Sequence, residues 1–181
     1  MTPRYIYIIS DLHLGGTPAR DSEQEKTVGF QMCPPESRQR LARFIHHICN
    51  AHRKDTTELV INGDFVDFLA EETEYFETTA PVLSSERYES FTADPSRAVA
   101  KLRRIIQHTD DGVPTDDQVF EALRQFVGNG NSLTILLGNH DIELSLPAVR
   151  YALMREITRG RPARMQFLHD GEAYTQGDLL I

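Results

Sequence analysis

This sequence contains three clusters of side chains that can bind metal ions or transfer protons. Each cluster comes directly after a run of apolar residues. They are Asp11 with His13, Asp64 with Asp67, and Asn139 with His140 and Asp141. Polar groups at the end of a buried strand must regain their lost hydration from hydrogen-bond partners or from a bound cation. Singly, Asp11 or Asp64 is explained as well by a turn. Together, the three clusters predict a metal-assisted reaction centre.

The spacing within these clusters suits metal chelation. Asp11 and His13 are alternate residues, so in an extended segment both side chains point to the same side and can hold one ion through an oxygen and a nitrogen. The carboxylate of Asp64 has two oxygens and can bridge two ions. Such mixed ligands suit manganese, iron or zinc better than magnesium. The sequence therefore predicts a site for divalent transition-metal ions.

The apolar runs that precede the clusters predict three short β-strands, at residues 5–9, 58–61 and 133–137. A helix predicted to begin at Ser37 separates the first two strands. Its apolar side chains recur on one face, at Leu41, Phe44, Ile45, Ile48 and Cys49. Strand, helix and strand in this order form a βαβ unit with parallel strands. Because the carboxyl ends of parallel strands share one edge of the sheet, we expect the three clusters to converge there in an α/β domain.

The rest of the chain predicts further helices and then a change of architecture. Helices are expected near Ser96, from Thr115, and over residues 147–158, and Thr115 with Gln118 fits a capping box. Residues 68–95 lack periodicity, and we expect them to form an insertion or a lid. After Met165, short extended runs separated by Asp-Gly and Gly-Asp predict the start of an antiparallel meander.

The three clusters also resemble the signature of a known family. In this sequence the motifs are Asp11-Leu12-His13, Gly63-Asp64-Phe65-Val66-Asp67 and Gly138-Asn139-His140-Asp141. They resemble the Asp-x-His, Gly-Asp-x-x-Asp and Gly-Asn-His-Asp/Glu motifs of the calcineurin-like metallophosphoesterases, in the same order. The resemblance implies a single domain over residues 1–181 with a four-layer α-β-β-α sandwich. This chain would supply the first sheet of that sandwich and the start of the second.

The resemblance further implies which residues bind metal. Asp11 and His13 would bind a first ion, Asp64 would bridge both ions, and Asn139 would bind the second ion through its carbonyl oxygen. The implied cofactors are two divalent ions, manganese, iron or zinc, with manganese favoured.

The same resemblance implies the catalytic residues. His140 would donate a proton or hydrogen bond to the substrate phosphate or its leaving group, and Asp67 would orient the His140 imidazole. Asp141 would hold neighbouring site residues in place without binding a metal. The family has a further histidine and a closing Gly-His-x-His motif, which this sequence lacks. We therefore expect the chain to be C-terminally incomplete and, by itself, weakly active or inactive.

The expected activity is hydrolysis of a phosphoester or pyrophosphate bond in a small phosphorylated substrate by a metal-activated water. The motifs look most similar to the bacterial branch of the family that includes UDP-2,3-diacylglucosamine pyrophosphatases. Two alternatives remain open. One is a nuclease or cyclic-nucleotide phosphodiesterase of the same family, and the other is a non-catalytic protein-interaction module on the same fold.

The amino-acid composition limits which binding partners and which cellular compartment we expect for this protein. A net charge of −8 and a pI near 5.3 disfavour a nucleic-acid-binding face but not an anionic substrate, because bound cations can supply the local positive charge. Two cysteines without zinc-type spacing favour a reducing compartment. The sequence shows no segment of membrane-spanning length, so we expect a cytoplasmic protein whose oligomeric state is open.

Overall fold

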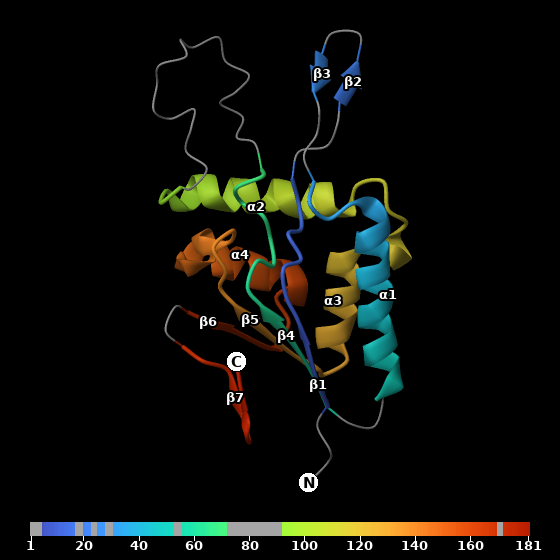
Figure 1. Cartoon of the computed structure of the whole chain (residues 1–181), viewed down its shortest axis with the longest axis vertical. Coiled ribbons are helices and arrows are strands. Elements are labelled where there is room, and N and C mark those ends of the chain that lie inside the picture. Colours follow the sequence, from blue (N-terminus) through green and yellow to red (C-terminus); the bar gives the residue numbers. More distant parts are fainter. Residues whose placement is uncertain are drawn as a thin grey trace.

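The computed structural model describes residues 5–16, 20–22, 25–27, 31–52, 56–71, 92–169 and 172–181 (Figure 1). The strands are β1 (Tyr5–Ile9), β2 (Arg20–Ser22), β3 (Glu25–Thr27), β4 (Thr57–Asn62), β5 (Ser132–Leu136), β6 (Arg164–Leu168), β7 (Thr175–Gln176) and β8 (Leu179–Leu180). The α-helices are α1 (Pro35–Ala51), α2 (Pro95–Asp110), α3 (Val119–Gly128) and α4 (Pro147–Thr158). Two 3₁₀ turns, η3 (Thr115–Asp117) and η4 (Ile142–Ser145), precede α3 and α4.

Four parallel strands form the central sheet, in the order β1-β4-β5-β6. All five residues of β5 are buried, as are the first five of β4, and both strands are rich in apolar side chains. Continuous burial of this kind is typical of central strands in parallel sheets. The predicted α/β class is therefore confirmed.

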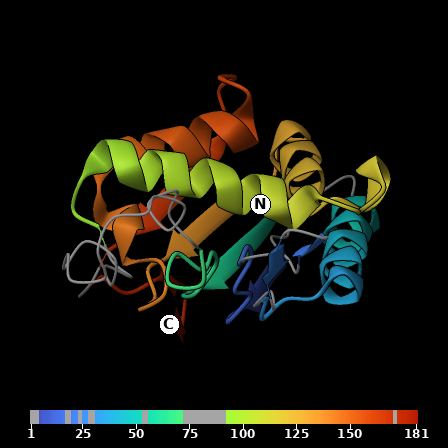
Figure 2. The ribbon, with the colours of Figure 1, turned by 90° about the horizontal axis from the view of Figure 1, so that it is seen from above.

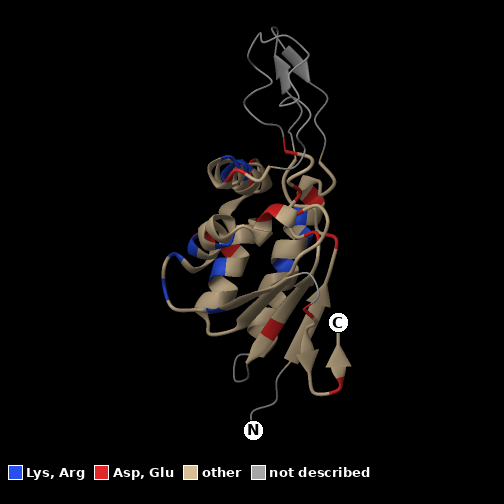
Figure 3. Ribbon diagram, turned by 90° about the vertical axis from the view of Figure 1, so that its left-hand side faces the viewer, with Lys and Arg blue, Asp and Glu red and all other residues tan. Residues whose placement is uncertain are grey.

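The helices pack on one face of this sheet and enclose the main core (Figure 3). The apolar side chains predicted for the helix faces all belong to this core or pack against it, some of them only partly buried. In α3, for example, all five predicted side chains are buried, namely Val119, Phe120, Leu123, Phe126 and Val127. Helix α2 runs across this layer beside the loops at the carboxyl ends of the strands, as the view from above shows (Figure 2).

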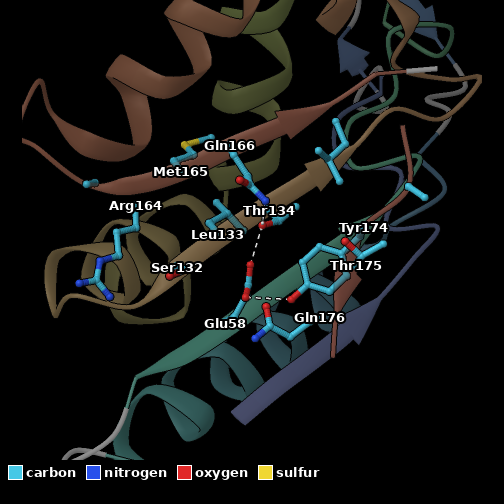
Figure 4. Close-up of a pocket in the computed structure, with 13 residues that line it drawn as sticks. Glu58, Ser132, Leu133, Thr134, Arg164, Met165, Gln166, Tyr174, Thr175 and Gln176 are labelled. Carbon is cyan, nitrogen blue, oxygen red and sulfur yellow. Dashed lines mark hydrogen bonds between the residues drawn. The ribbon is translucent and has the colours of Figure 1, made fainter. Parts of the chain in front are cut away.

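The other face of the sheet carries a polar ladder and the β7–β8 hairpin (Figure 4). Glu58 is buried there and accepts hydrogen bonds from the Thr134 hydroxyl at 2.8 Å and the Tyr174 hydroxyl at 2.9 Å. Gln166 donates to Thr134 from the neighbouring strand, at 3.1 Å. A second, smaller core of Val60, Leu136 and Tyr174 lies under the hairpin. The four-layer sandwich stays a prediction, because the described residues show one helix layer, the four-stranded sheet and two separate two-stranded pairs, β2–β3 and β7–β8.

Strand β6 corrects the prediction that residues from Met165 onward begin an antiparallel meander. It pairs with β5 in parallel register, with Met165 opposite Leu133. Helix α4 is the reason, because it provides the long crossover that a parallel connection needs. The hairpin prediction is confirmed only for β7 and β8, which pair antiparallel around Gly177 and Asp178.

Two predicted helix starts are also wrong. Helix α1 begins at Pro35 rather than Ser37, with Pro34 at its N-cap. Thr115 lies in η3, so it cannot form the predicted capping box. The side-chain amide of Gln118 instead donates to the backbone carbonyls of Asp110 and Val113, at 3.4 and 3.3 Å. The predicted insertion at residues 68–95 is described only at its two ends, residues 68–71 and 92–95.

One carboxyl group at the end of α2 should make stability depend on pH. Burial raises the pKa of Asp110 from its ordinary 3.8 to about 6, and its Oδ1 has no hydrogen-bond partner among the described residues. The folded state then binds this proton more tightly than the unfolded state. Its contribution to stability is therefore greatest below pH 4 and falls as pH rises through 6.

We predict that Asp110→Asn removes this dependence. Compared with wild type, the variant should gain roughly 1–2 kcal/mol of unfolding free energy between pH 4 and pH 7.5, a figure reduced from the full shift because the residue is partly exposed. Urea denaturation at both pH values measures the difference. Asp116→Asn, at an exposed position three residues before α3, is the control and should show no such gain. Equal changes in unfolding free energy for Asp110→Asn and Asp116→Asn would contradict the raised pKa of Asp110.

Candidate metal centre

Backbone hydrogen bonds continue past the ends of β1 and β4 and join the first two motifs. The amides of Leu12 and His13 both donate to the carbonyl of Asp64, each at 2.9 Å, and the amide of Asp67 donates to the carbonyl of Leu14 at 2.8 Å. Leu14 and Val66 also form an isolated parallel bridge. The convergence expected from the parallel topology is therefore present in the backbone itself.

The third motif is attached to the second in the same way. The backbone amide of His140 donates to Asp64 Oδ1 at 2.9 Å, and the amide of Phe68 donates to the His140 carbonyl at 3.0 Å. Gly138 lies so close to Asp64 that a Cβ at position 138 would come within 2.1 Å of Asp64 Oδ1. Only a glycine leaves room for this approach.

Four of the predicted site residues come together at this edge of the sheet. His13 Nε2 lies 3.8 Å from Asp64 Oδ2, and His13 Nδ1 lies 3.5 Å from Asp67 Oδ2. Asp67 Oδ1 lies 3.1 Å from His140 Nδ1. The two imidazoles meet edge to face, with their ring centroids 4.4 Å apart. One carboxylate, Asp67, thus faces both histidines.

The arrangement fits a bound cation. His13, Asp64 and His140 each offer a ligand atom, and these atoms lie within 4.8 Å of one another. Within the described part of the chain, His13 Nδ1 and Asp67 Oδ2 are buried without a hydrogen-bond partner. These two atoms face each other at 3.5 Å, which leaves His13 Nε2, on the side of Asp64, as the nitrogen that can bind an ion.

Two predicted metal ligands lie at the margin of this group. Asp11 and Asn139 are both exposed, and the oxygens of Asp11 are not among the atoms that cluster within 4.8 Å. His140, which the resemblance assigns to the substrate, is instead part of that cluster. The positions of Asp11 and Asn139 in the loops after β1 and β5 nevertheless place both residues at the same edge of the sheet as the cluster.

The backbone of the centre is strained. Asp11, His13 and Asp64 have φ values of 55°, 44° and 49°, in the left-handed region that non-glycine residues seldom adopt. Each such conformation costs about 1–3 kcal/mol and persists only where the surroundings impose it. All three residues are predicted metal ligands, so the strain coincides with the predicted chemistry.

Asp141 supports the centre by binding backbone. It is fully buried, and its carboxylate accepts from the Gly138 amide at 2.7 Å and from the Phe65 amide at 2.8 Å. Burial raises the pKa of Asp141 to about 6, while these two amides oppose the rise. Asp141 therefore fastens the third loop to the second through hydrogen bonds to backbone.

The sequence analysis missed a buried charged group beside the centre. Lys101, on α2, is 2% exposed, and the nearby carboxylates of Glu71 and Glu143 are also buried. A signal for it was present, because Lys101 falls on the apolar face of α2 beside Leu102 and Ile105. In the first loop, Gly15 makes room for the side chain of Ile105, which a Cβ at position 15 would meet at 2.8 Å.

Comparison with known proteins gives one match. A model of the calcineurin-like phosphoesterase family matches residues 4–175, which is nearly the whole chain. No curated protein and no solved structure matches it. Among the helices that the structure describes, none has the length and apolar character needed to cross a membrane.

The close contact at Gly138 gives a direct test of this geometry. Gly138→Ala should lower the free energy of unfolding by about 3 kcal/mol or more, because the new methyl group overlaps Asp64. It should also abolish metal binding, measured by titration calorimetry. Gly128→Ala is the control, since a Cβ there meets nothing within 4 Å, and it should stabilise the protein by about 0.5 kcal/mol. Similar stabilities for the two variants would refute the contact.

Proposed function

Because this chain belongs to the calcineurin-like phosphoesterase family, we propose that it hydrolyses a phosphoester or pyrophosphate bond with two divalent ions bound at the carboxyl edge of β1, β4 and β5. The family is generally one of metal-dependent phosphoester hydrolases, and a His/Asp group that can hold a metal lies in this chain where the three motifs meet. The observation that carries the proposal is this convergence of His13, Asp64, Asp67 and His140.

The proposed ligands of the first ion are Asp11 and His13, with Asp64 shared between both ions and Asn139 completing the second. The 3.8 Å separation of His13 Nε2 and Asp64 Oδ2 supports a shared ion between them, since it is too long for a hydrogen bond. When bound, the ions would supply Lewis-acid charge for the phosphate oxygens and lower the pKa of the attacking water. Mixed oxygen and nitrogen ligands suit manganese, iron or zinc, and manganese is the ion that we favour.

His140 is the proposed catalytic acid or hydrogen-bond donor. Its Nδ1 lies 3.1 Å from Asp67 Oδ1, so the carboxylate favours a proton on that nitrogen. Nε2 is then the nitrogen available to the substrate phosphate or the leaving group. Asp67 is well placed for this role because it is 1% exposed and is itself held by the Ala70 amide at 2.9 Å. An imidazole fixed in this way needs no reorientation during the reaction.

The proposed substrate is a small diester or pyrophosphate. Support comes from the form of the motifs, which looks most similar to the branch with UDP-2,3-diacylglucosamine pyrophosphatases. A net charge of −8 gives no long-range attraction for a polyanion. Binding of a compact anion would rely on the cations of the site, which are local and strong.

We predict that His140→Ala lowers kcat for a chromogenic phosphodiester by about 10²–10⁴-fold while manganese still binds. The loss follows from removing the proposed donor. The assay compares bis-p-nitrophenyl phosphate with p-nitrophenyl phosphate, and the diester should be the better substrate. His47→Ala, on the exposed side of α1, is the control and should retain full activity. If His140→Ala matches wild type, the catalytic assignment fails.

Asn139→Ala tests the proposed ligand set separately. Removing one neutral ligand should lower the affinity for the second ion about 10–100-fold, the size of loss seen when groups that support metal sites are removed. Binding of the first ion should be unchanged. Manganese titration followed by electron paramagnetic resonance counts the ions per chain. The variant should bind one ion under conditions in which wild type binds two. Equal affinity of both ions in the two proteins would exclude Asn139 as a ligand.

A further inference from the structure

A buried carboxylate, Glu71, attaches the loop after β4 to helix α2. Arg104 Nε donates to Glu71 Oε1 at 3.2 Å, and His108 Nδ1 lies 3.1 Å from Glu71 Oε2. The two partners are four residues apart, so they lie on one face of the helix. The Glu71 side chain is 1% exposed, and both contacts are therefore shielded from water. Each oxygen of this carboxylate has a hydrogen-bond partner on α2.

Helix α2 is a firm support for this contact. Its N-terminus is capped by Asp94, whose carboxylate accepts a hydrogen bond from the Ser96 amide at 2.8 Å. Leu102 and Ile105 anchor the helix in the main core. Ile105 also packs against Gly15 of the first loop, and the helix runs beside the loops at the carboxyl ends of the strands (Figure 2). A residue that is bound to α2 is thus held relative to the whole domain.

A short path of hydrogen bonds leads from Glu71 to the proposed catalytic histidine. The amide of Ala70, the residue before Glu71, donates to Asp67 Oδ1 at 2.9 Å and closes a turn over residues 67–70. The same oxygen lies 3.1 Å from His140 Nδ1. Because a planar peptide bond joins Ala70 to Glu71, the position of Glu71 limits where the Ala70 amide can point.

The two ends of this turn are held by different contacts. At its start, the Asp67 amide donates to the Leu14 carbonyl at 2.8 Å, and the Phe68 amide donates to the His140 carbonyl at 3.0 Å. At its far end, Glu71 binds α2. The start fixes the backbone of Asp67, whereas the far end fixes the amide that holds its side chain.

A charged residue at position 71 is costly for stability alone. Removing a carboxylate from water costs several kcal/mol, and apolar residues of similar size often replace buried ion pairs without loss of stability. A leucine would fill much of the same volume. The retention of a glutamate with a partner for each oxygen is explained if its exact contacts serve the site.

We propose that Glu71 is a positioning residue of the catalytic centre, which acts by holding the turn of residues 67–71 on α2. The held turn keeps the Ala70 amide on Asp67 Oδ1. Asp67 in turn keeps the His140 imidazole in one orientation, with a proton on Nδ1. This inference rests on the proposed hydrolytic function for its kinetic consequence, but not for its structural one.

The first test replaces Glu71 with leucine, which removes both contacts with α2. Glu71→Leu should lower kcat about 10–100-fold with KM changed less than about threefold, because a supporting residue acts through Asp67 and not on the substrate. Glu71→Gln is the conservative variant. Its amide keeps a hydrogen-bonding atom toward each partner, so it should recover at least part of kcat. Equal losses in the leucine and glutamine variants would contradict a role for these hydrogen bonds.

A double-mutant cycle tests whether Glu71 acts through α2. Arg104→Met should also lower kcat, by about 3–10-fold, because it removes one of the two contacts. The combined variant Glu71→Leu with Arg104→Met should be no slower than Glu71→Leu, since the contact is already lost. Arg103→Met is the matched control, because it removes a charge from an exposed position of the same helix, and it should retain wild-type kinetics. Additive losses would show that the two residues act independently.

A further readout does not depend on turnover. In ¹⁵N NMR of histidine-labelled protein loaded with zinc, which is diamagnetic, wild type should show His140 with a proton on Nδ1. Glu71→Leu should show a mixture of tautomers. A folded Glu71→Leu protein with an unchanged tautomer would overturn the proposal, whether or not kcat had fallen. If circular dichroism shows that this variant does not fold, Arg104→Met carries the test, with a mixed tautomer expected and an unchanged one decisive.

The two readouts separate this inference from the proposed function. A wild-type protein that binds manganese but hydrolyses no phosphoester would end the proposed function. The role of Glu71 would then stand or fall on the tautomer of His140 alone. An active wild type with a Glu71→Leu variant of normal kcat and normal tautomer would leave the hydrolase intact and remove Glu71 from its mechanism.

Discussion

The site depends on the close approach of Gly138 to Asp64. A methyl group at position 138 would come within 2.1 Å of Asp64 Oδ1, so the loop after β5 lies directly on the loop after β4. Asp141 maintains the contact by accepting hydrogen bonds from Gly138 on one side and Phe65 on the other. The His140 amide in turn fixes Asp64 Oδ1. The positions of the proposed ligands therefore follow from backbone contacts before any ion is considered.

This packing concentrates charge in a small volume. Asp67, Asp141 and Glu143 are each no more than 1% exposed, and the chain has a net charge of −8. Carboxylates at such depth are tolerated only when backbone amides or cations face them. Asp141 is satisfied by amides. Glu143 accepts a hydrogen bond from the Thr92 amide, and Asp67 accepts one from the Ala70 amide and faces His13 and His140. In the proposed function, bound ions would balance the side of Asp67 that faces His13.

Backbone strain and buried polar atoms occur together at the carboxyl edge of the sheet. Three non-glycine residues with positive φ belong to the first two motifs. The buried atoms His13 Nδ1 and Asp67 Oδ2, which lie 3.5 Å apart without a hydrogen bond, are beside them. A protein that only had to fold would gain stability by relaxing these features. Their persistence at the place where the three motifs meet supports a site that was selected for binding and chemistry.

The sequence by itself determined the parallel βαβ core, the buried helix faces and the edge at which the three motifs meet. These features follow from local periodicity and from the rule that parallel strands end on one side, so they need no knowledge of distant contacts. Only the tertiary structure decided that β6 joins the parallel sheet, that Gln118 bonds to Asp110 and Val113 instead of capping α3, and that Asp141 binds backbone. It alone also brought Glu71 to Arg104 and His108. Each of these depends on pairing groups far apart in the chain, and a single sequence does not reveal which buried charge will face which.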